Sequence, residues 1–252
     1  MRIKWESQGD GTPVLLMHGL GYTREGWGPL RDLLARRYRV ISFDNRGIGE
    51  SEIPPGPYTV DQLAGDGIAV LDEAGVGRAH VLGASLGGFA AQALAAEFPG
   101  RVDRLVLACT SPGGAGSFPL PEGTLRLMAE APSLPPEVAM RRFVENALAP
   151  AAPPALADEL YAYRLAHPPD PAGWAAQAAA GAGWDAGDRL SSIAAPTLVI
   201  TGIEDRVVDP RNAPLLVERI GDARLVEIER AGHMLFWEQT EEFASAVEGF
   251  LG

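Results

Sequence analysis

Residues 78–98 read RAHVLGASLGGFAAQALAAEF: an apolar run, a Gly-Ala-Ser-Leu-Gly corner and an alanine-rich run in succession. The first five residues have the length and apolar content of a buried strand. The last ten favour a helix, which a Pro-Gly pair then ends. A chain that passes from strand to helix through one corner residue strains that residue's backbone, and a Cβ at Gly83 or Gly87 would collide with the turning chain. The stretch therefore predicts a sharp turn that lifts the Ser85 hydroxyl clear of the backbone.

This placement gives Ser85 a possible chemical role. The N-terminus of the following helix carries partial positive charge, which would favour an oxyanion that develops beside it. The five-residue pattern alone is weak evidence, because a chain of this composition contains Gly-x-Ser-x-Gly by chance roughly one time in seven. A serine hydroxyl is also a poor nucleophile at neutral pH, so a base and a group that orients the base must be found elsewhere in the chain.

Composition limits the class of protein. The 252 residues suit one α/β domain with an insertion, and the net charge of −12 argues against nucleic acid and anionic membranes as partners. No apolar run approaches the roughly 20 residues of a membrane span, and the first residues lack the apolar core of a signal peptide. The single cysteine, Cys109, fits a reducing compartment, so we expect a cytoplasmic protein. The histidines are scattered, and we expect no metal and no cofactor.

Apolar runs alternate with helical stretches, which is typical of a mostly parallel sheet flanked by helices. The expected strands are Val14–Met17, Val40–Phe43, His80–Leu82, Val102–Leu107, Thr197–Thr201 and Leu225–Ile228, with a short strand at Ile3–Glu6. The expected helices are Gly28–Arg37, Val60–Ala74, Gly88–Phe98, Asn212–Ile220 and Thr240–Phe250.

The alternation stops from about Gly113 to Gly187, where prolines crowd. Helical segments remain there, notably Pro136–Ala149 and Ala155–Ala166, and no clear strand does. We therefore expect a core domain formed by residues 1–112 and 188–252, with residues 113–187 as a helical lid over the sheet.

His233 is the best candidate for the base. It follows Gly232, which permits a sharp turn, and lies between an expected strand and the last helix. His80 begins the strand before Ser85, at the far end of the sheet, and His167 precedes two prolines in the lid. His18 directly follows a strand and is better explained as shaping its own loop.

Asp205 is the best candidate for the orienting acid. It lies in the loop after the strand Thr197–Thr201, at the carboxyl end where chemistry in open α/β sheets collects. Glu204 and Asp209 occupy the same loop and remain alternatives. The chain order Ser85, Asp205, His233 differs from both common serine-protease orders.

Five motifs in this order resemble the α/β-hydrolase superfamily over nearly the whole chain: His18-Gly19-Leu20-Gly21, Asp44 to Ser51, the Ser85 corner, the turn from Gly202 to Asp205, and Gly232-His233. The resemblance implies an α/β-hydrolase fold with a catalytic triad of Ser85, His233 and Asp205. It also implies that the backbone N–H groups of Leu20 and Leu86 form the oxyanion hole. It further implies a structural role, forming a turn beside the site, for Asp44, Arg46, Gly47 and Gly49.

A serine at the corner limits the reactions that the protein could catalyse. Relatives that open epoxides or displace halide use aspartate there, so Ser85 favours acyl transfer, and we expect a small-molecule ester or lactone as substrate. The chain looks similar to small carboxylesterases and to enol-lactonases of the 3-oxoadipate type. The same motifs occur in C–C bond hydrolases and cofactor-free perhydrolases, and in small-molecule receptors with vestigial turnover. Lid arginines at 141, 142 and 164 are candidates for binding a substrate carboxylate, with a solvated helix face as the alternative.

Aromatic residues offer walls for a substrate pocket. The candidates are Tyr22, close to the Gly19-Leu20 loop, and Phe143, Trp174 and Trp184 in the lid. Packing within the lid core is the competing explanation for the lid residues. The sequence carries no prediction of oligomeric state.

Overall fold

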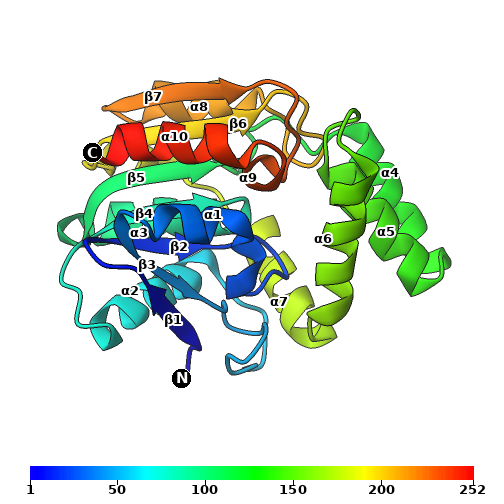
Figure 1. Ribbon diagram of the computed structural model, residues 1–252, viewed down its shortest axis with the longest axis horizontal. Helices are drawn as coiled ribbons and strands as arrows, with labels where there is room; N and C mark the ends of the chain where they lie inside the picture. Colours follow the sequence, from blue (N-terminus) through cyan, green and yellow to red (C-terminus); the bar gives the residue numbers. More distant parts are fainter.

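Seven strands form one sheet in the order β1-β3-β2-β4-β5-β6-β7 in a computed structural model that describes residues 1–252 (Figure 1). The strands are β1 Trp5–Gln8, β2 Thr12–Met17, β3 Tyr38–Phe43, β4 Ala79–Ala84, β5 Val102–Ala108, β6 Thr197–Gly202 and β7 Ala223–Ile228. Only β1 runs antiparallel to its neighbour, β3. The other pairs are parallel, for example with Leu16 opposite Leu82. The predicted mostly parallel sheet is thus confirmed.

Helices cover both faces of the sheet. The α-helices are α1 Pro29–Leu34, α2 Val60–Glu73, α3 Leu86–Glu97, α4 Glu122–Glu130, α5 Pro136–Ala147, α6 Pro154–Ala166, α7 Pro171–Ala182, α8 Asn212–Arg219, α9 Leu235–Glu238 and α10 Thr240–Leu251. Short 3₁₀ helices lie at η1 Arg24–Trp27, η2 Pro99–Arg101, η3 Ala131–Ser133 and η4 Gly187–Ser192.

The apolar side chains of each strand divide between two cores. On β2, Leu15 and Met17 join the core under α2, α3 and α8, whereas Val14 and Leu16 join the core under α1, α9 and α10. Successive side chains of a strand point to opposite faces, so a strand buried on both sides must be apolar at nearly every position. This explains why the strands read as continuous apolar runs.

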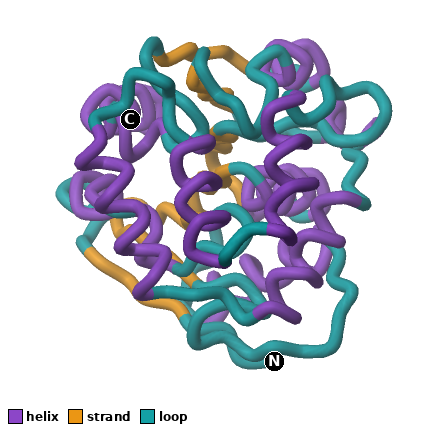
Figure 2. Tube along the Cα trace, turned by 90° about the vertical axis from the view of Figure 1, so that its right-hand side faces the viewer, coloured by secondary structure: helices purple, strands orange, loops and turns teal.

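Helices α4 to α7 form the insertion between β5 and β6 and stand together at one end of the sheet (Figure 1). They contact the loops that leave the carboxyl ends of the strands. Tyr163 on α6 hydrogen-bonds Thr23 beyond β2, and Ala147 at the end of α5 accepts a hydrogen bond from Met234 beyond β7. Figure 2 views the molecule from this side, with helices in front of the strands. We call α4 to α7 the cap helices.

The sequence predicted α5 and α6 but neither α4 nor α7. Pro136, Pro154 and Pro171 each occupy the first residue of a helix. Proline is favoured there, because the first N–H of a helix has no intrahelical partner and the fixed φ suits the helix. The proline-rich region is therefore helical throughout most of its length.

Candidate active site

Ser85 occupies a strained turn between β4 and α3. Its φ of 54° and ψ of −119° lie in a region that residues with a side chain rarely adopt. The backbone N–H of Ser85 donates to the Ala108 carbonyl (3.0 Å), and its carbonyl accepts from the Thr110 hydroxyl (2.8 Å). Hydrogen bonds to β5 and to the segment after it thus hold the turn in place.

The two glycines beside Ser85 are required, for different reasons. A Cβ on Gly83 would lie 2.3 Å from the Gly87 carbonyl oxygen, within the turning chain as predicted. A Cβ on Gly87 would lie 1.9 Å from the Met17 carbonyl oxygen, so the neighbouring strand β2 excludes a side chain there. Helix α3 can begin immediately after Ser85 only because neither Gly83 nor Gly87 carries a side chain.

The loop after β2 packs against Ser85. A Cβ on Gly19 would lie 3.1 Å from the Ser85 Cβ and 3.7 Å from its Oγ. The loop is a turn in which the Tyr22 N–H donates to the Gly19 carbonyl (3.3 Å), with Gly21 at φ 73°. The N–H of Leu20 donates no hydrogen bond within the chain. Leu86 is the first residue of α3, where helical N–H groups lack intrahelical partners.

His233 and Asp205 form a buried hydrogen-bonded pair. His233 Nδ1 lies 2.8 Å from Asp205 Oδ2, and the two residues are 8% and 5% exposed. The other carboxylate oxygen, Oδ1, accepts the backbone N–H groups of Val207 (2.7 Å) and Val208 (2.9 Å). When Nδ1 donates its proton to Asp205, Nε2 is left as an acceptor, which is the tautomer that a general base needs.

The strand order places these residues at one edge of the sheet. Ser85 follows β4, Asp205 follows β6 and His233 follows β7, and these strands are parallel within the run β4-β5-β6-β7. The carboxyl ends of parallel strands meet at the same edge, which is where binding sites of open α/β sheets form.

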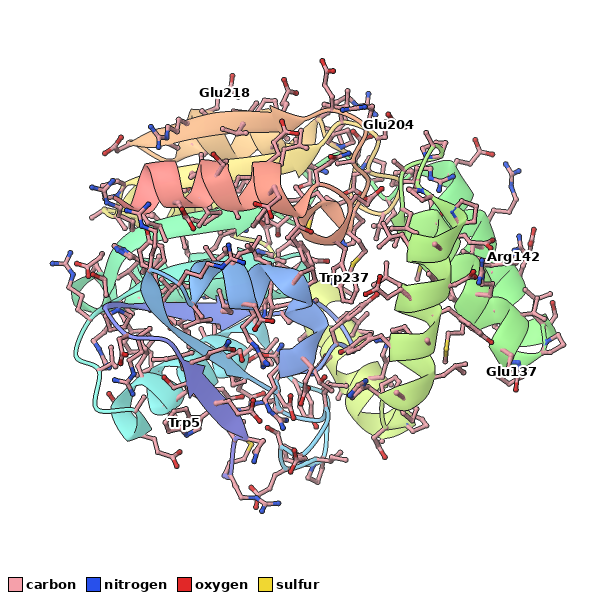
Figure 3. All side chains as sticks on the ribbon, in the orientation of Figure 1. Trp5, Glu137, Arg142, Glu204, Glu218 and Trp237 are labelled. Atoms are coloured by element: carbon pink, nitrogen blue, oxygen red, sulfur yellow. The ribbon has the colours of Figure 1, made fainter.

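The two alternative acids in this loop are placed elsewhere. Asp209 pairs with Arg211 at 2.6 Å, and this contact lowers the pKa of the Asp209 carboxyl. Glu204 is half-exposed and lies at the periphery of the molecule (Figure 3). Of the three, Asp205 is the carboxylate that contacts His233.

Glu238 supports the His233 loop and was not among the residues predicted from the sequence. Its two carboxylate oxygens accept the backbone N–H groups of Ala149 (2.6 Å) and Gly232 (2.7 Å). Burial raises the pKa of this carboxyl despite both hydrogen bonds. The residue thus ties the turn before His233 to the segment after α5. A glutamate five residues beyond His233 carries no local signal of this role.

His18 shapes the loop after β2, as the sequence suggested. Its Nδ1 accepts the Gly19 N–H (2.7 Å), and its ring stacks on Tyr22 with centroids 4.7 Å apart. Burial lowers the pKa of His18 to about 3, so the imidazole is neutral at ordinary pH. His80 packs against Tyr38 and His167 stacks on Tyr163.

The four candidate pocket residues have different surroundings. Tyr22 stacks on both His18 and Tyr163, and Trp174 contacts the turn at Gly21, where a Cβ would lie 2.7 Å from its Cδ1. Trp184 is 7% exposed and stacks on Phe89. Phe143, on α5, is 39% exposed. The structure therefore brings Tyr22 and Trp174 to the loop beside Ser85, gives Trp184 a core-packing role, and leaves Phe143 at the surface.

The three candidate arginines of the cap differ in their partners. Arg141 pairs with Glu145 and Asp158, and Arg142 pairs with Glu130 on the outer side of α5 (Figure 3). Arg164 has no carboxylate partner. It donates to the Gly21 carbonyl, and its guanidinium lies 4.5 Å from the centre of the Tyr22 ring.

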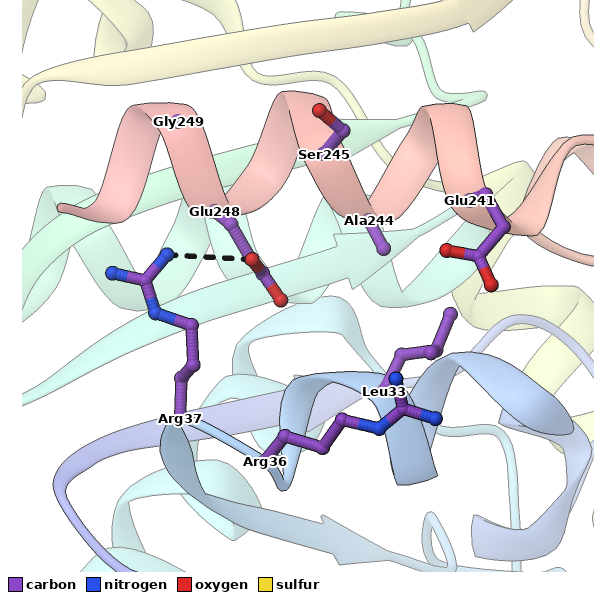
Figure 4. A pocket seen from close by; sticks show the side chains of 8 residues that line it. All are labelled: Leu33, Arg36, Arg37, Glu241, Ala244, Ser245, Glu248 and Gly249. Carbon is purple, nitrogen blue, oxygen red and sulfur yellow. Dashed lines mark hydrogen bonds and ion pairs between the residues drawn. The ribbon is translucent and has the colours of Figure 1, made fainter.

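A surface groove runs between α1 and α10 (Figure 4), lined by Leu33, Arg36, Arg37, Glu241, Ala244, Ser245, Glu248 and Gly249. Arg36 and Arg37 precede β3, so the groove lies toward the amino ends of the strands, opposite Ser85. No cluster of three or more His, Cys, Asp or Glu side chains is arranged to hold a metal ion. No helix has the length and apolar character needed to cross a membrane.

Comparisons with known proteins agree with this architecture. Residues 12–240 match the family model described as alpha/beta hydrolase fold. The chain is 31% identical to the protein of Azorhizobium caulinodans named "Putative carbamate hydrolase RutD", over 99% of this chain and 95% of the relative. It is also 31% identical to a 2-hydroxy-6-oxo-6-phenylhexa-2,4-dienoate hydrolase of Comamonas testosteroni, over 99% and 91%.

Among solved structures, the enol-lactonase of Burkholderia xenovorans LB400 superposes with a TM-score of 0.84. The two sequences are 28% identical, and the superposition covers 99% of this chain and 96% of the enol-lactonase chain. The family match spans most of the chain, and the sheet order and the turn at Ser85 suit it. The chain belongs to the alpha/beta hydrolase fold family.

Proposed function

We propose that the protein is a serine hydrolase that cleaves carboxylic esters or lactones of small molecules through an acyl-enzyme. Ser85 is the nucleophile, His233 the general base, and Asp205 the group that orients His233. The backbone N–H groups of Leu20 and Leu86 form the oxyanion hole.

The contact between His233 and Asp205 carries this proposal. At 2.8 Å, inside a site where the second carboxylate oxygen is already held by two backbone N–H groups, it fixes the imidazole in one tautomer. The proposal is further supported by the strained turn at Ser85 and by the unpaired Leu20 N–H on the adjoining loop. The same geometry is compatible with a small-molecule receptor, which turnover measurements distinguish from an enzyme.

The reaction follows from these roles. Ser85 Oγ attacks the carbonyl carbon while its proton passes to His233 Nε2, and the Leu20 and Leu86 N–H groups receive the oxyanion. Collapse of the tetrahedral intermediate breaks the bond to the leaving oxygen, which takes the proton from His233. In a lactone this oxygen stays attached to the acyl chain. A water then attacks the acyl-enzyme, gives its proton to His233, and the proton returns to Ser85 as the acid leaves.

Two observations bear on the substrate. A solved relative is named as an enol-lactonase, and Arg164 is a cap arginine that lacks a carboxylate partner and lies beside the Gly21 turn. We therefore place an anionic lactone among the candidate substrates. Residues 113–187 would act as the cap that covers it, with Tyr22 and Trp174 as pocket walls.

Hydrolysis of a C–C bond is the second candidate, favoured by the relative of Comamonas testosteroni that is named as a dienoate hydrolase. The same Ser85 and His233 would serve it. A panel of esters, lactones and vinylogous 1,5-diketones separates the two functions, because only a C–C hydrolase releases products from the diketones.

The first test compares turnover of p-nitrophenyl acetate by the wild-type protein and by Ser85→Ala. We expect a loss of at least about 10³-fold in kcat, the magnitude typical of removing a triad nucleophile. Ser42→Ala, which removes the hydroxyl of another buried serine, on β3 and outside the proposed site, is the matched control. Equal rates for wild type and Ser85→Ala would refute the enzymatic proposal.

A further inference from the structure

Gln177 of α7 connects the cap to two loops of the core. It is fully buried, with 0% exposure, although its side chain is polar. Its Oε1 accepts the backbone N–H of Gly21 (3.1 Å), and its Nε2 donates to the carbonyl of Arg46 (2.8 Å). A buried amide must satisfy both ends, and Gln177 satisfies them on the loops after β2 and after β3.

The Gly21 N–H belongs to the central peptide of the turn from Gly19 to Tyr22. A turn with positive φ at its third residue is of type II. If its central peptide flips, the turn becomes the commoner type I, and the Leu20 carbonyl and the Gly21 N–H exchange directions. In the flipped form the Leu20 carbonyl would replace the Gly21 N–H opposite Gln177 and would face an acceptor, Oε1. Gln177 therefore stabilises the form of the turn that the structure has.

The cap holds the other polar group of Gly21 as well. Arg164 of α6 donates to the Gly21 carbonyl, and Trp174 covers the position where a Cβ would project. Helix α7 approaches the core so closely that a Cβ on Gly173 would lie 1.9 Å from the Gly47 carbonyl oxygen. The two backbone groups of Gly21 are thus held from the cap by two helices, the N–H by α7 and the carbonyl by α6, and α7 is itself packed backbone to backbone against the core.

We infer that Gln177 is a positioning residue for the oxyanion hole: by fixing the Leu20–Gly21 peptide it restrains Leu20, whose own N–H lies in the preceding peptide of the same turn. The inference rests on the proposed function, since it assigns that N–H to the oxyanion. The cap then serves the chemical step directly, in addition to covering the substrate.

The test replaces Gln177 with Met, which has similar length but neither hydrogen bond. We expect kcat to fall by about 10- to 100-fold with KM changed by less than about threefold, because a displaced oxyanion donor weakens transition-state binding. Affinity for a trifluoromethyl ketone, which forms a tetrahedral adduct with the serine, should fall in parallel with kcat/KM. Unchanged kcat and unchanged ketone affinity in a folded Gln177→Met protein would overturn the inference.

Gln92→Met is the matched control. Gln92 of α3 is 1% exposed and donates to the Ser111 carbonyl (3.0 Å), with no hydrogen bond to the oxyanion loop. It should lower stability without the loss of kcat. A loss of kcat equal to that of Gln177→Met would indicate general destabilisation and overturn the inference.

A second readout does not depend on turnover. Hydrogen exchange of the segment 18–23 should be faster in Gln177→Met than in wild type or Gln92→Met, because the Gly21 N–H loses its acceptor. If no substrate is turned over, the proposed function fails, while hydrogen exchange still reports on the conformation of the turn.

If the Met variant does not fold, Gln177→Glu keeps an acceptor for the Gly21 N–H. Slow exchange of the segment in Gln177→Glu would support the inference, and fast exchange would overturn it.

Discussion

Asp205→Asn tests the proposed triad most directly, because the structure dictates how the new amide must lie. One carboxylate oxygen of Asp205 accepts two backbone N–H groups, from Val207 and Val208, and the other accepts His233 Nδ1–H. The amide oxygen of Asn must stay at the two N–H groups, since an NH₂ there would face two donors. The NH₂ then points at His233 Nδ1.

This orientation forces His233 into the wrong tautomer. To accept a hydrogen bond from the amide, Nδ1 must lose its proton, and Nε2 must carry it. The lone pair that would take the Ser85 proton is then absent. The corresponding change in a serine protease lowers kcat by about 10⁴, or about 5.5 kcal/mol of transition-state stabilisation at about 1.36 kcal/mol per decade. We expect a loss of similar size here.

The assay is kcat for p-nitrophenyl acetate, measured beside thermal unfolding. Stability should change by no more than about 3 kcal/mol, because the two backbone hydrogen bonds persist with a neutral acceptor. Asp209→Asn is the control, since Asp209 pairs with Arg211 instead of with His233. The reasoning is refuted if Asp205→Asn retains kcat within tenfold of wild type, or if Asp209→Asn loses as much.

Further predictions concern stability and are checked by denaturation. Gly173→Ala should destabilise the fold by about 1–3 kcal/mol, because its Cβ would lie 1.9 Å from a carbonyl oxygen of the loop after β3. Gly65→Ala, inside α2 with no atom within 4 Å, should stabilise by about 0.5–1 kcal/mol. Burial lowers the pKa of His18 from 6.5 to about 3, so protonation favours the unfolded chain as pH falls below 6.5. This residue should remove about 2 kcal/mol between pH 7 and pH 5, and His18→Gln should lack that loss. Asp66→Asn should lower the free energy of unfolding by about 3 kcal/mol. In the wild-type protein Arg46 Nε lies 2.6 Å from the Asp66 carboxylate, and the variant leaves this largely buried guanidinium without its charge partner.

Much of the fold was predictable because the sheet is buried on both faces. Strands β2 to β7 were all located from apolar runs, with ends that differ from the prediction by no more than three residues. Such a strand is apolar at nearly every position, so its signal is local and strong. The N-terminal strand was less accurate. It was predicted at Ile3–Glu6 and lies at Trp5–Gln8, where it is an edge strand with two exposed residues.

The cap helices were harder to predict, because proline acts differently at different helix positions. Inside a helix it removes a hydrogen bond and clashes, whereas at the first residue it costs nothing. Pro171 begins α7 behind Asp170, whose side chain accepts two N–H groups of the first turn. The Asp-Pro pair is therefore a start signal for α7, which the sequence prediction did not use.

Local sequence was sufficient to predict the turn at Ser85 and the positions of the strands along the chain. The apolar runs, Gly83 and the helix that follows are adjacent in the chain, whereas Gly87 is required by strand β2 and the order of the strands within the sheet is a property of the folded chain. Long-range packing was needed to select Asp205 over its neighbours in one loop and to reveal Glu238 and Gln177. Gln177 lies 156 residues from the glycine that it holds, and its partners are backbone groups, which leave no trace in the identity of the residues they belong to. Contacts of this kind arise only when the chain has folded, because they depend on where two loops and a helix meet.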